Sequence, residues 1–266
     1  MTTPLVQDQT SGSLHLRPSS SHLLELEGVA KSFANGIVIL DAISTRIEEN
    51  TFVSFIGPSG CGKSSLLRII TGLIPPSSGR VLYRGQEVHG VNTKTAMVFQ
   101  SFALFPWLTV AENVALGLEA QGVPPRQRLR RANKYIDMVG LDGYERAYPK
   151  ELSGGMKQRV GLARSLTLEP ELLCMDQPFS ALDVLTAANL REQVLDIWQS
   201  KKIVTKTIIL VTHSVEEAVF MSDRILVYAN KPGRIVADEL ITLPRPRKMK
   251  SKEVEEVVDH FYSLIV

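Results

Sequence analysis

The chain has 266 residues, of which 44% are hydrophobic and 22% are charged. This composition is typical of a folded protein and excludes collagen-like and generally disordered chains. The net charge of +2 is too small to indicate a nucleic-acid partner, and apolar runs such as Ile208–Val211 are far too short to cross a bilayer. Cys61 and Cys174 are the only cysteines, which excludes a disulfide framework and fits a reducing compartment.

The alternation of short apolar segments with helical segments indicates an α/β domain. Residues 1–20 are polar and predict a disordered tail. Strands are predicted at Leu23–Gly28, Thr51–Ile56, Ala96–Phe99, Leu172–Met175, Thr207–Val211, Ile225–Val227 and Ile235–Val236. Helices are predicted at Lys63–Thr71, Val184–Trp198 and Val215–Met221. Buried strands that alternate with helices favour a parallel sheet.

The middle of the chain, from Pro106 to Leu168, is predicted to be helical and to form a subdomain inserted into the α/β domain. Thr109 and Glu112 have the spacing of a capping box at the start of its first helix. The basic stretch Arg126–Arg131 is better explained as a solvated helix face than as a binding patch.

After Leu243 the chain combines basic residues with a final apolar periodicity. We predict that Arg245, Arg247 and the lysines that follow form a solvated linker; contact with acidic lipid headgroups is the alternative. The last apolar residues recur at helical spacing and predict a docked C-terminal helix, or a boundary beyond which a longer chain continued: Val254, Val257, Val258 and Phe261.

The strongest local signal is the segment Gly57-Pro58-Ser59-Gly60-Cys61-Gly62-Lys63-Ser64, which matches the phosphate-binding loop G-x-x-x-x-G-K-[ST] without a mismatch. A predicted strand precedes it and a predicted helix follows it. The glycines allow successive N–H groups to point into one concavity, and the helix N-terminus adds partial positive charge. Lys63 can reach the β/γ-phosphates, and the Ser64 hydroxyl can ligate Mg²⁺.

Two weaker signals accompany this loop. The apolar strand Leu172–Met175 ends in Asp176, a carboxylate that can hold the water shell of Mg²⁺. The segment Leu152-Ser153-Gly154-Gly155-Met156-Lys157-Gln158 predicts a helix that begins at Gly154 with Ser153 as its N-cap, and such a helix start can face an anion. Taken alone, these features also fit a turn carboxylate and an ordinary capped helix.

Together, and in this order, the motifs resemble those of the ATP-binding subunits of ABC transporters, whose signature is LSGGQ. The resemblance spans about Leu23 to Ile241. It implies a P-loop NTPase ABC cassette of α/β class, with a mostly parallel core sheet, an antiparallel β subdomain and an inserted helical subdomain. The implied boundaries are a tail over 1–20, an ATP-binding domain over 21–243 with its helical subdomain at about 101–168, and a basic linker with a C-terminal helix over 244–266.

The resemblance also assigns roles to individual residues. The implied ATP-binding residues are Phe33, which would stack on adenine, and the loop residues Gly57, Pro58, Ser59, Gly60, Cys61, Gly62, Lys63, Ser64 and Ser65. Contacts to ATP on the opposite subunit would come from Ser153, Gly154, Gly155, Gln158 and Asp183. Mg²⁺ would be held by Ser64, Gln100 and Asp176, and the implied catalytic residues are Lys63, Gln100, Gln177 and the switch histidine His213.

One residue departs from the family pattern. After Asp176 the family has a glutamate that acts as general base, and this chain has Gln177. An amide keeps the shape but has no carboxylate to accept a proton. Because general-base help is worth about 10²–10⁴-fold in rate, we expect ATP to bind normally and hydrolysis to be strongly slowed. The intact remaining motifs favour an engineered replacement, and a naturally degenerate site is the alternative.

A narrower resemblance points to importers of nitrate, sulfonates, taurine and related small anions. It rests on segments expected to lie away from the nucleotide: Phe105–Val110 continuing to Leu118, Ala181–Thr186 and Pro232–Ile235. The implied location is peripheral, at the cytoplasmic face of the membrane. The implied partners are a second ATP-binding subunit, transmembrane permease subunits and, indirectly, a solute-binding protein, with no nucleic acid.

The aromatic residues Phe102, Phe105 and Trp107 are expected to face the permease, unless they form the core of the helical subdomain. Two other functions stay open from the sequence: a soluble ABC ATPase in DNA repair or translation, and a regulatory subunit that binds ATP without hydrolysing it. We also expect the Cys61 thiol to be reactive because it lies in an electropositive loop, and Cys174 to be unreactive within its strand.

Overall fold

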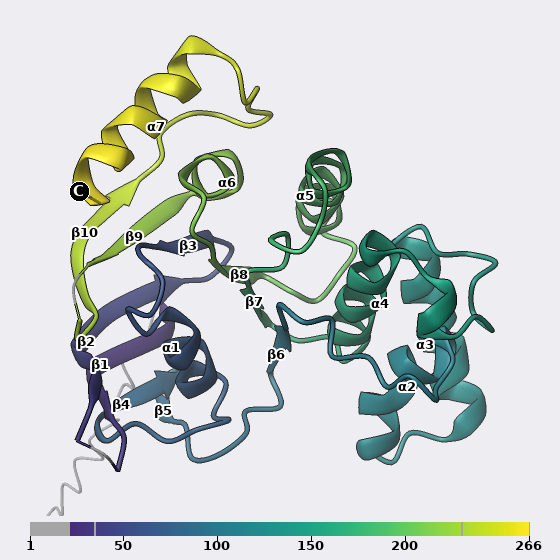
Figure 1. The fold of residues 1–266 in the computed structure, drawn as a ribbon. Coiled ribbons are helices and arrows are strands. Elements are labelled where there is room, and N and C mark those ends of the chain that lie inside the picture. The colour runs from purple at the N-terminus through teal and green to yellow at the C-terminus, as the bar shows by residue number, and fades with distance from the viewer. Residues whose placement is uncertain (1–21, 35, 230, 266) are drawn as a thin grey trace, which may run out of the picture.

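The computed structural model describes residues 22–34, 36–229 and 231–265, and it shows two sheets with helices around them (Figure 1). The tail predicted over 1–20 lies outside the described residues. Most predicted strands and helices are present, with ends that differ by a few residues.

The larger sheet has the strand order β10-β9-β3-β8-β7-β6, and its neighbouring strands are parallel except for β9 and β10. Its strands are β3 (Phe52–Ile56), β6 (Thr95–Val98), β7 (Leu172–Asp176), β8 (Thr207–Val211), β9 (Arg224–Ala229) and β10 (Arg234–Leu240). Every residue of β3, β6, β7 and β8 is buried, as expected for strands covered on both faces. The predicted mostly parallel core sheet is therefore confirmed.

The smaller sheet is antiparallel, with the order β2-β1-β4-β5. Its strands are β1 (His22–Ser32), β2 (Val38–Glu48), β4 (Ser78–Tyr83) and β5 (Gln86–Glu87). Apolar side chains of this sheet, of helix α1 (Lys63–Ile70) and of one side of the core sheet form a single buried cluster. The antiparallel sheet thus braces α1 against the core sheet.

A group of helices lies beside β6, away from the antiparallel sheet (Figure 1). It contains α2 (Val110–Ala120), α3 (Pro125–Met138), a short 3₁₀ helix (Pro149–Glu151) and α4 (Gly154–Thr167). The capping box of Thr109 and Glu112 is confirmed at the start of α2. On α3, Arg126 and Arg130 are exposed, as a solvated face requires.

The remaining helices are α5 (Val184–Gln199), α6 (Val215–Met221) and α7 (Lys252–Ile265). Helix α7 packs on α6 and β9 and buries Val254, Val258 and Phe261. None of the helices within the described ranges is long and apolar enough to cross a membrane.

The basic segment before α7 is not solvated throughout. The buried Arg247 guanidinium donates to the carbonyl oxygens of Val219 and Ser222 at the end of α6, and to that of Leu243 in its own segment. Burial and the nearby Arg245 lower the pKa of Arg247 to about 10. Arg245 itself pairs with Asp223. The solvated-linker prediction is wrong for these two arginines because carbonyls at a helix end need donors.

Candidate nucleotide-binding site

The phosphate-binding loop, Gly57–Ser64, connects the carboxyl end of β3 to the first turn of α1. Gly57 and Gly62 have φ angles of 144° and 92°. A Cβ on Gly57 would collide with the carbonyl oxygen of Tyr228, and a Cβ on Gly62 would lie 2.6 Å from Leu40 Cδ2. Both positions therefore require glycine. The loop leads into a helix whose first N–H groups have no intrahelical acceptor, an arrangement that binds phosphate.

Lys63 places its positive charge inside this loop. Its Nζ donates to the carbonyl oxygens of Gly57 at 2.7 Å and Pro58 at 2.8 Å, and it lies 3.4 Å from Cys61 Sγ. The side chain is only 4% exposed. An ammonium held among loop carbonyls, beside free helix N–H groups, complements a polyphosphate.

Ser64 and Asp176 meet although they are far apart in the sequence. The Ser64 hydroxyl donates to Asp176 Oδ1 at 2.7 Å. Asp176 is 5% exposed at the end of β7, and Ser64 lies in the first turn of α1. A hydroxyl and a carboxylate are hard oxygen ligands, so this pair fits Mg²⁺ that also coordinates phosphate oxygens.

Gln177 and Gln100 are joined through Ser180. The Ser180 hydroxyl donates to the Gln177 carbonyl oxygen at 3.0 Å, and Gln100 Nε2 donates to Ser180 Oγ at 3.3 Å. Gln177 has a φ of 47°, in the left-handed region that a non-glycine residue rarely adopts. Such strain is typical of functional sites.

His213 lies at the same edge of the core sheet as Gln177. Strands β7 and β8 pair in parallel with Asp176 opposite Val211, and the Gln177 N–H donates to the Val211 carbonyl oxygen at 2.9 Å. His213, two residues further along, is exposed. The fold therefore gathers the loop, Asp176, Gln177 and His213 at the carboxyl ends of adjacent strands, where ligands bind in α/β proteins.

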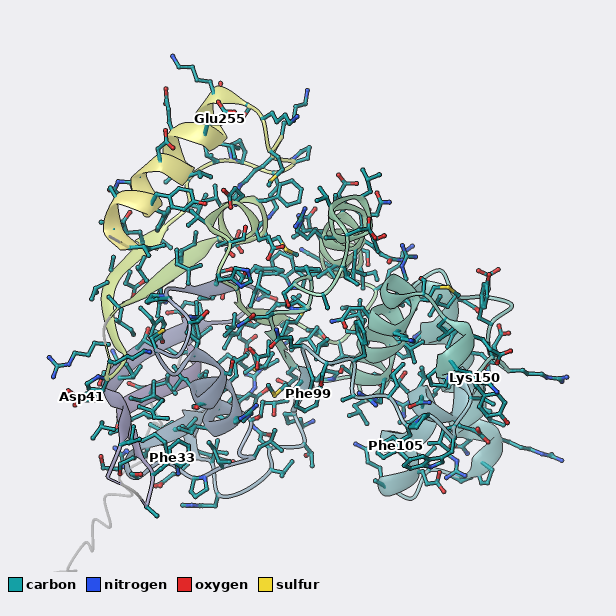
Figure 2. All side chains as sticks on the ribbon, viewed as in Figure 1. Phe33, Asp41, Phe99, Phe105, Lys150 and Glu255 are labelled. Atoms are coloured by element: carbon teal, nitrogen blue, oxygen red, sulfur yellow. The ribbon has the colours of Figure 1, made fainter. Side chains whose placement is uncertain are left out.

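Phe33 lies apart from the loop, in the connection between β1 and β2 (Figure 2). Its ring is 47% exposed, and the Lys31 ammonium lies 5.9 Å from the ring centroid. The start of β2 links this hairpin to the nucleotide loop, because Ile39 and Leu40 pack against Gly62. An exposed ring on this hairpin is free to stack on a base.

The residues expected to act on a second subunit form a separate group. Ser153 and Gly154 are exposed at the start of α4, where Ser153 Oγ accepts from the Met156 N–H at 3.3 Å. Asp183 is exposed and caps α5 by accepting from the Thr186 N–H at 3.0 Å. Figure 1 shows α4 well apart from α1, with strands of the core sheet between them. One chain therefore does not bring the signature helix to its own phosphate loop.

The sequence profile described as "ABC transporter" matches residues 40–180, more than half of the chain. The chain belongs to the ABC transporter family.

The chain is also similar to two named relatives and to one solved structure. The nitrate import ATP-binding protein NrtD of Synechocystis sp. is 45% identical over 222 residues, which cover 84% of this chain and 82% of that protein. The aliphatic sulfonates import ATP-binding protein SsuB of Bacillus cereus is 40% identical over 237 residues, covering 88% and 92%. A dimeric ATP-binding cassette solved with ADP and Pi has a TM-score of 0.73 at 32% identity, covering 83% of this chain and 100% of that one. The predicted ABC-cassette fold is confirmed.

Within this family site, the placement of Gln158 and Cys61 differs from the prediction. Gln158, expected to reach the opposite ATP, is 1% exposed, and its amide atoms have no hydrogen-bond partner among the described residues. Its side chain is therefore enclosed in the protein and is not presented to a second subunit. Cys61 is also fully buried, in the cluster beneath α1, so the expected reactive thiol is not accessible.

The segment Pro232–Ile235 was expected to lie away from the nucleotide, and the structure places it against the loop. A Cβ on Gly233 would collide with the Cys61 carbonyl oxygen, and the Lys231 ammonium lies 3.3 Å from where a Gly60 Cβ would be. No short-range sequence signal predicts this contact, since it arises from the parallel pairing of β3 with β9. The sequence predicted both of these strands but not that they pair, and that pairing brings the segment to the loop.

Proposed function

We propose that this chain is the ATP-binding subunit that powers import of a small anion, such as nitrate, a sulfonate or taurine. The subunit would act at the cytoplasmic face of the cell membrane. The observation that carries the proposal is the hydrogen bond between Ser64 and Asp176 beside a complete phosphate loop. The relatives named for nitrate and aliphatic sulfonate import support the anion class.

In this role the loop N–H groups and Lys63 bind the β- and γ-phosphates of ATP. Ser64, Asp176 and Gln100 would hold Mg²⁺, which would neutralise the phosphate charge when bound. His213 and Gln177 follow the ends of β8 and β7, and from there they would face the γ-phosphate. Phe33 stacks on the adenine.

Gln177 sets the rate of hydrolysis in this proposal. Its amide can hydrogen-bond an attacking water but cannot accept the proton. We therefore infer a subunit that binds ATP well and hydrolyses it slowly. The same residue supports a second candidate, a natural degenerate or regulatory ATP-binding subunit of a heterodimeric ABC ATPase.

The exposed signature group supports a dimeric arrangement, as in the dimeric cassette that this fold resembles. Ser153, Gly154 and Asp183 of one subunit would complete the site of a second subunit, which is a copy of this chain or a related chain. The adjoining Gly155 would act by bringing α4 close to α5 rather than by contact, since it is buried against Thr186. Gln158 is no longer proposed for this contact.

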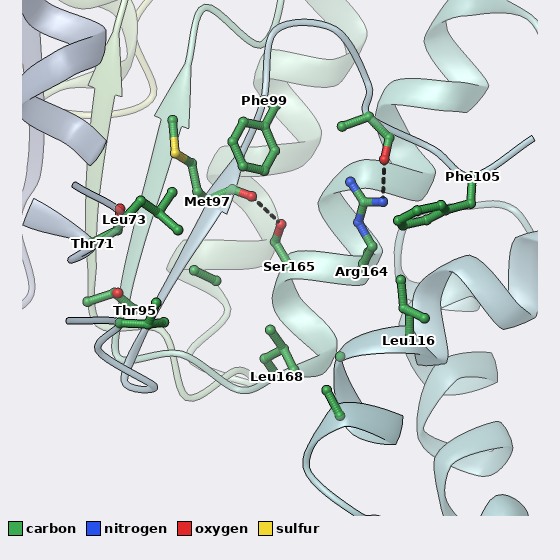
Figure 3. Close-up of a pocket in the computed structure, with 15 residues that line it drawn as sticks. Thr71, Leu73, Thr95, Met97, Phe99, Phe105, Leu116, Arg164, Ser165 and Leu168 are labelled. Atoms are coloured by element: carbon green, nitrogen blue, oxygen red, sulfur yellow. Dashed lines mark hydrogen bonds between the residues drawn. The ribbon is translucent and has the colours of Figure 1, made fainter. Parts of the chain in front are cut away.

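An apolar groove next to Gln100 is the proposed docking place of the permease (Figure 3). It has a volume of about 510 Å³ and is lined by side chains that include Met97, Phe99, Phe105, Leu116 and Leu168. Trp107, 69% exposed, and Phe105, 38% exposed, lie close together with their ring centroids 5.4 Å apart. A cytoplasmic segment of the permease would fill the groove. Because Gln100 directly follows the groove residue Phe99, binding of that segment would affect the position of Gln100.

The proposal is tested first on the nucleotide. We predict that the chain binds MgATP, that Lys63→Ala abolishes binding, and that Gln177→Glu raises the ATPase rate by at least about 10²-fold. The measurements are calorimetric titration with MgATP and steady-state phosphate release. The matched control is Lys150→Ala, which removes an exposed lysine of the helical group (Figure 2). Equal turnover of the chain and its Gln177→Glu variant would show that Gln177 does not occupy the general-base position.

A further inference from the structure

Arg191, in the middle of α5, contacts two segments that carry residues of the nucleotide site. Its Nη1 donates to Glu217 Oε1 at 2.7 Å, and its guanidinium lies 5.9 Å from the ring centroid of Phe179. The Arg191 and Glu217 side chains are 13% and 14% exposed, so the ion pair is largely removed from water. Screening by solvent is therefore weaker than for a surface pair.

The Glu217 end of this contact fixes the backbone around His213. Glu217 Oε2 accepts from the Thr212 hydroxyl at 2.7 Å. Thr212 Oγ1 in turn accepts from the Ser214 N–H at 3.1 Å, and Ser214 Oγ caps α6 by accepting from the Glu217 N–H at 3.1 Å. Thr212 is thus bonded to the carboxylate that Arg191 holds, and Ser214 is linked to it through the Thr212 hydroxyl and the Glu217 backbone.

The Phe179 end of the contact reaches the segment that carries Gln177. Phe179 is 2% exposed and lies two residues beyond Gln177. The next residue, Ser180, hydrogen-bonds the Gln177 carbonyl oxygen. Three residues further, Asp183 is the N-cap of α5, the helix that carries Arg191.

We propose that Arg191 is a positioning residue for ATP hydrolysis. It holds the Gln177 segment and the His213 segment at a fixed separation, so that both side chains address the same γ-phosphate. Because it projects from the helix that Asp183 caps, it also connects this alignment to the surface offered to the second subunit. The inference rests on the proposed function and adds a residue outside the nucleotide motifs.

The alternative is that Arg191 and Glu217 only hold α5 against α6. A purely structural pair would lower the melting temperature when broken, without a selective loss of turnover. A positioning pair lowers kcat while MgATP affinity, which depends on the loop and Lys63, stays unchanged.

The test uses the full chain with Gln177→Glu, so that turnover is measurable, and adds Arg191→Met, Arg191→Lys or Thr212→Val. Thr212→Val removes both hydrogen bonds of the Thr212 hydroxyl, to Glu217 and from the Ser214 N–H, and keeps the ion pair. We expect Arg191→Met and Thr212→Val each to lower kcat by about 10–100-fold, with the MgATP dissociation constant changed less than about twofold, since small misplacements of reacting groups have large rate effects. Arg191→Lys should keep part of the rate that Arg191→Met loses. The double variant Arg191→Met with Thr212→Val should be no slower than the slower of these two single variants.

The matched control is Arg131→Met, which breaks the Arg131–Glu169 pair beside the helical group and should leave kcat unchanged. A kcat within about twofold of the parent in Thr212→Val, or a loss of MgATP affinity in Arg191→Met as large as its loss of kcat, would overturn the inference. If the Gln177→Glu parent itself neither binds nor hydrolyses MgATP, the proposed function fails, and the inference fails with it.

Discussion

At the residue scale, the backbone and the side chain of a phosphate-loop residue can have different surroundings. Cys61 contributes its backbone to the loop, while its thiol is fully buried in the cluster beneath α1. Cys174 is equally buried in β7, and burial, with the nearby Asp176, raises the pKa of its thiol. Neither thiol is presented to a reagent in the folded protein.

We therefore predict that a bulky maleimide labels neither cysteine in the native chain, with or without MgATP. Both should label after denaturation in guanidinium chloride, which serves as the positive control. Raising the pH to about 9 should not expose Cys174, because access and not only ionisation limits it. Mass-spectrometric labelling measures both sites at once. Rapid native labelling of Cys61 that MgATP suppresses would show that its side chain faces the nucleotide.

At the element scale, the signature glycines have different surroundings. Gly154 is exposed at the start of α4, whereas Gly155 is buried against α5, where an added Cβ would collide with Thr186 Cγ2. The close approach of α4 to α5 thus depends on Gly155. The backbone of Ser153 and Gly154 stays exposed, as the proposed contact with a second subunit requires.

We predict that Gly155→Ala destabilises the chain by about 1–3 kcal/mol through overpacking. Adding Thr186→Ser removes the colliding methyl group and should restore most of the melting temperature. Thermal unfolding of the single and double variants, with Thr186→Ser alone as control, measures this. If the double variant is as unstable as Gly155→Ala, the contact with Thr186 is not what requires glycine.

Features formed by residues close together in the sequence could be predicted, whereas contacts between distant residues mostly could not. The strand, loop and helix around Lys63 and the capping box at Thr109 are local patterns, and the structure has them as predicted. The Ser64–Asp176 contact is non-local, and it was predictable only because a family pattern pairs the two residues. The Arg191–Glu217 pair has no such pattern, since it depends on how α5 and α6 pack. The inward turn of Gln158 depends in the same way on packing of α4.

At the scale of the whole molecule, the phosphate loop and the start of α4, which we propose to be the two halves of a shared ATP site, lie apart in one chain. The phosphate loop lies at the core sheet, and the exposed start of α4 lies in the separate helical group (Figure 1). Under the proposed function, a second subunit would bring its signature helix to each loop. If Gln177 slows hydrolysis as proposed, MgATP should hold two subunits together, because the step that would separate them is slow.

The most direct test of this arrangement is the molar mass of the chain by light scattering during size-exclusion chromatography, with and without MgATP. We predict a monomer without nucleotide and a stable dimer with MgATP. Lys63→Ala should stay monomeric under both conditions, and Gln177→Glu should form a dimer that decays as ATP is consumed. A chain that binds MgATP at saturation and remains monomeric at high protein concentration, even beside its membrane partners, would contradict a shared ATP site.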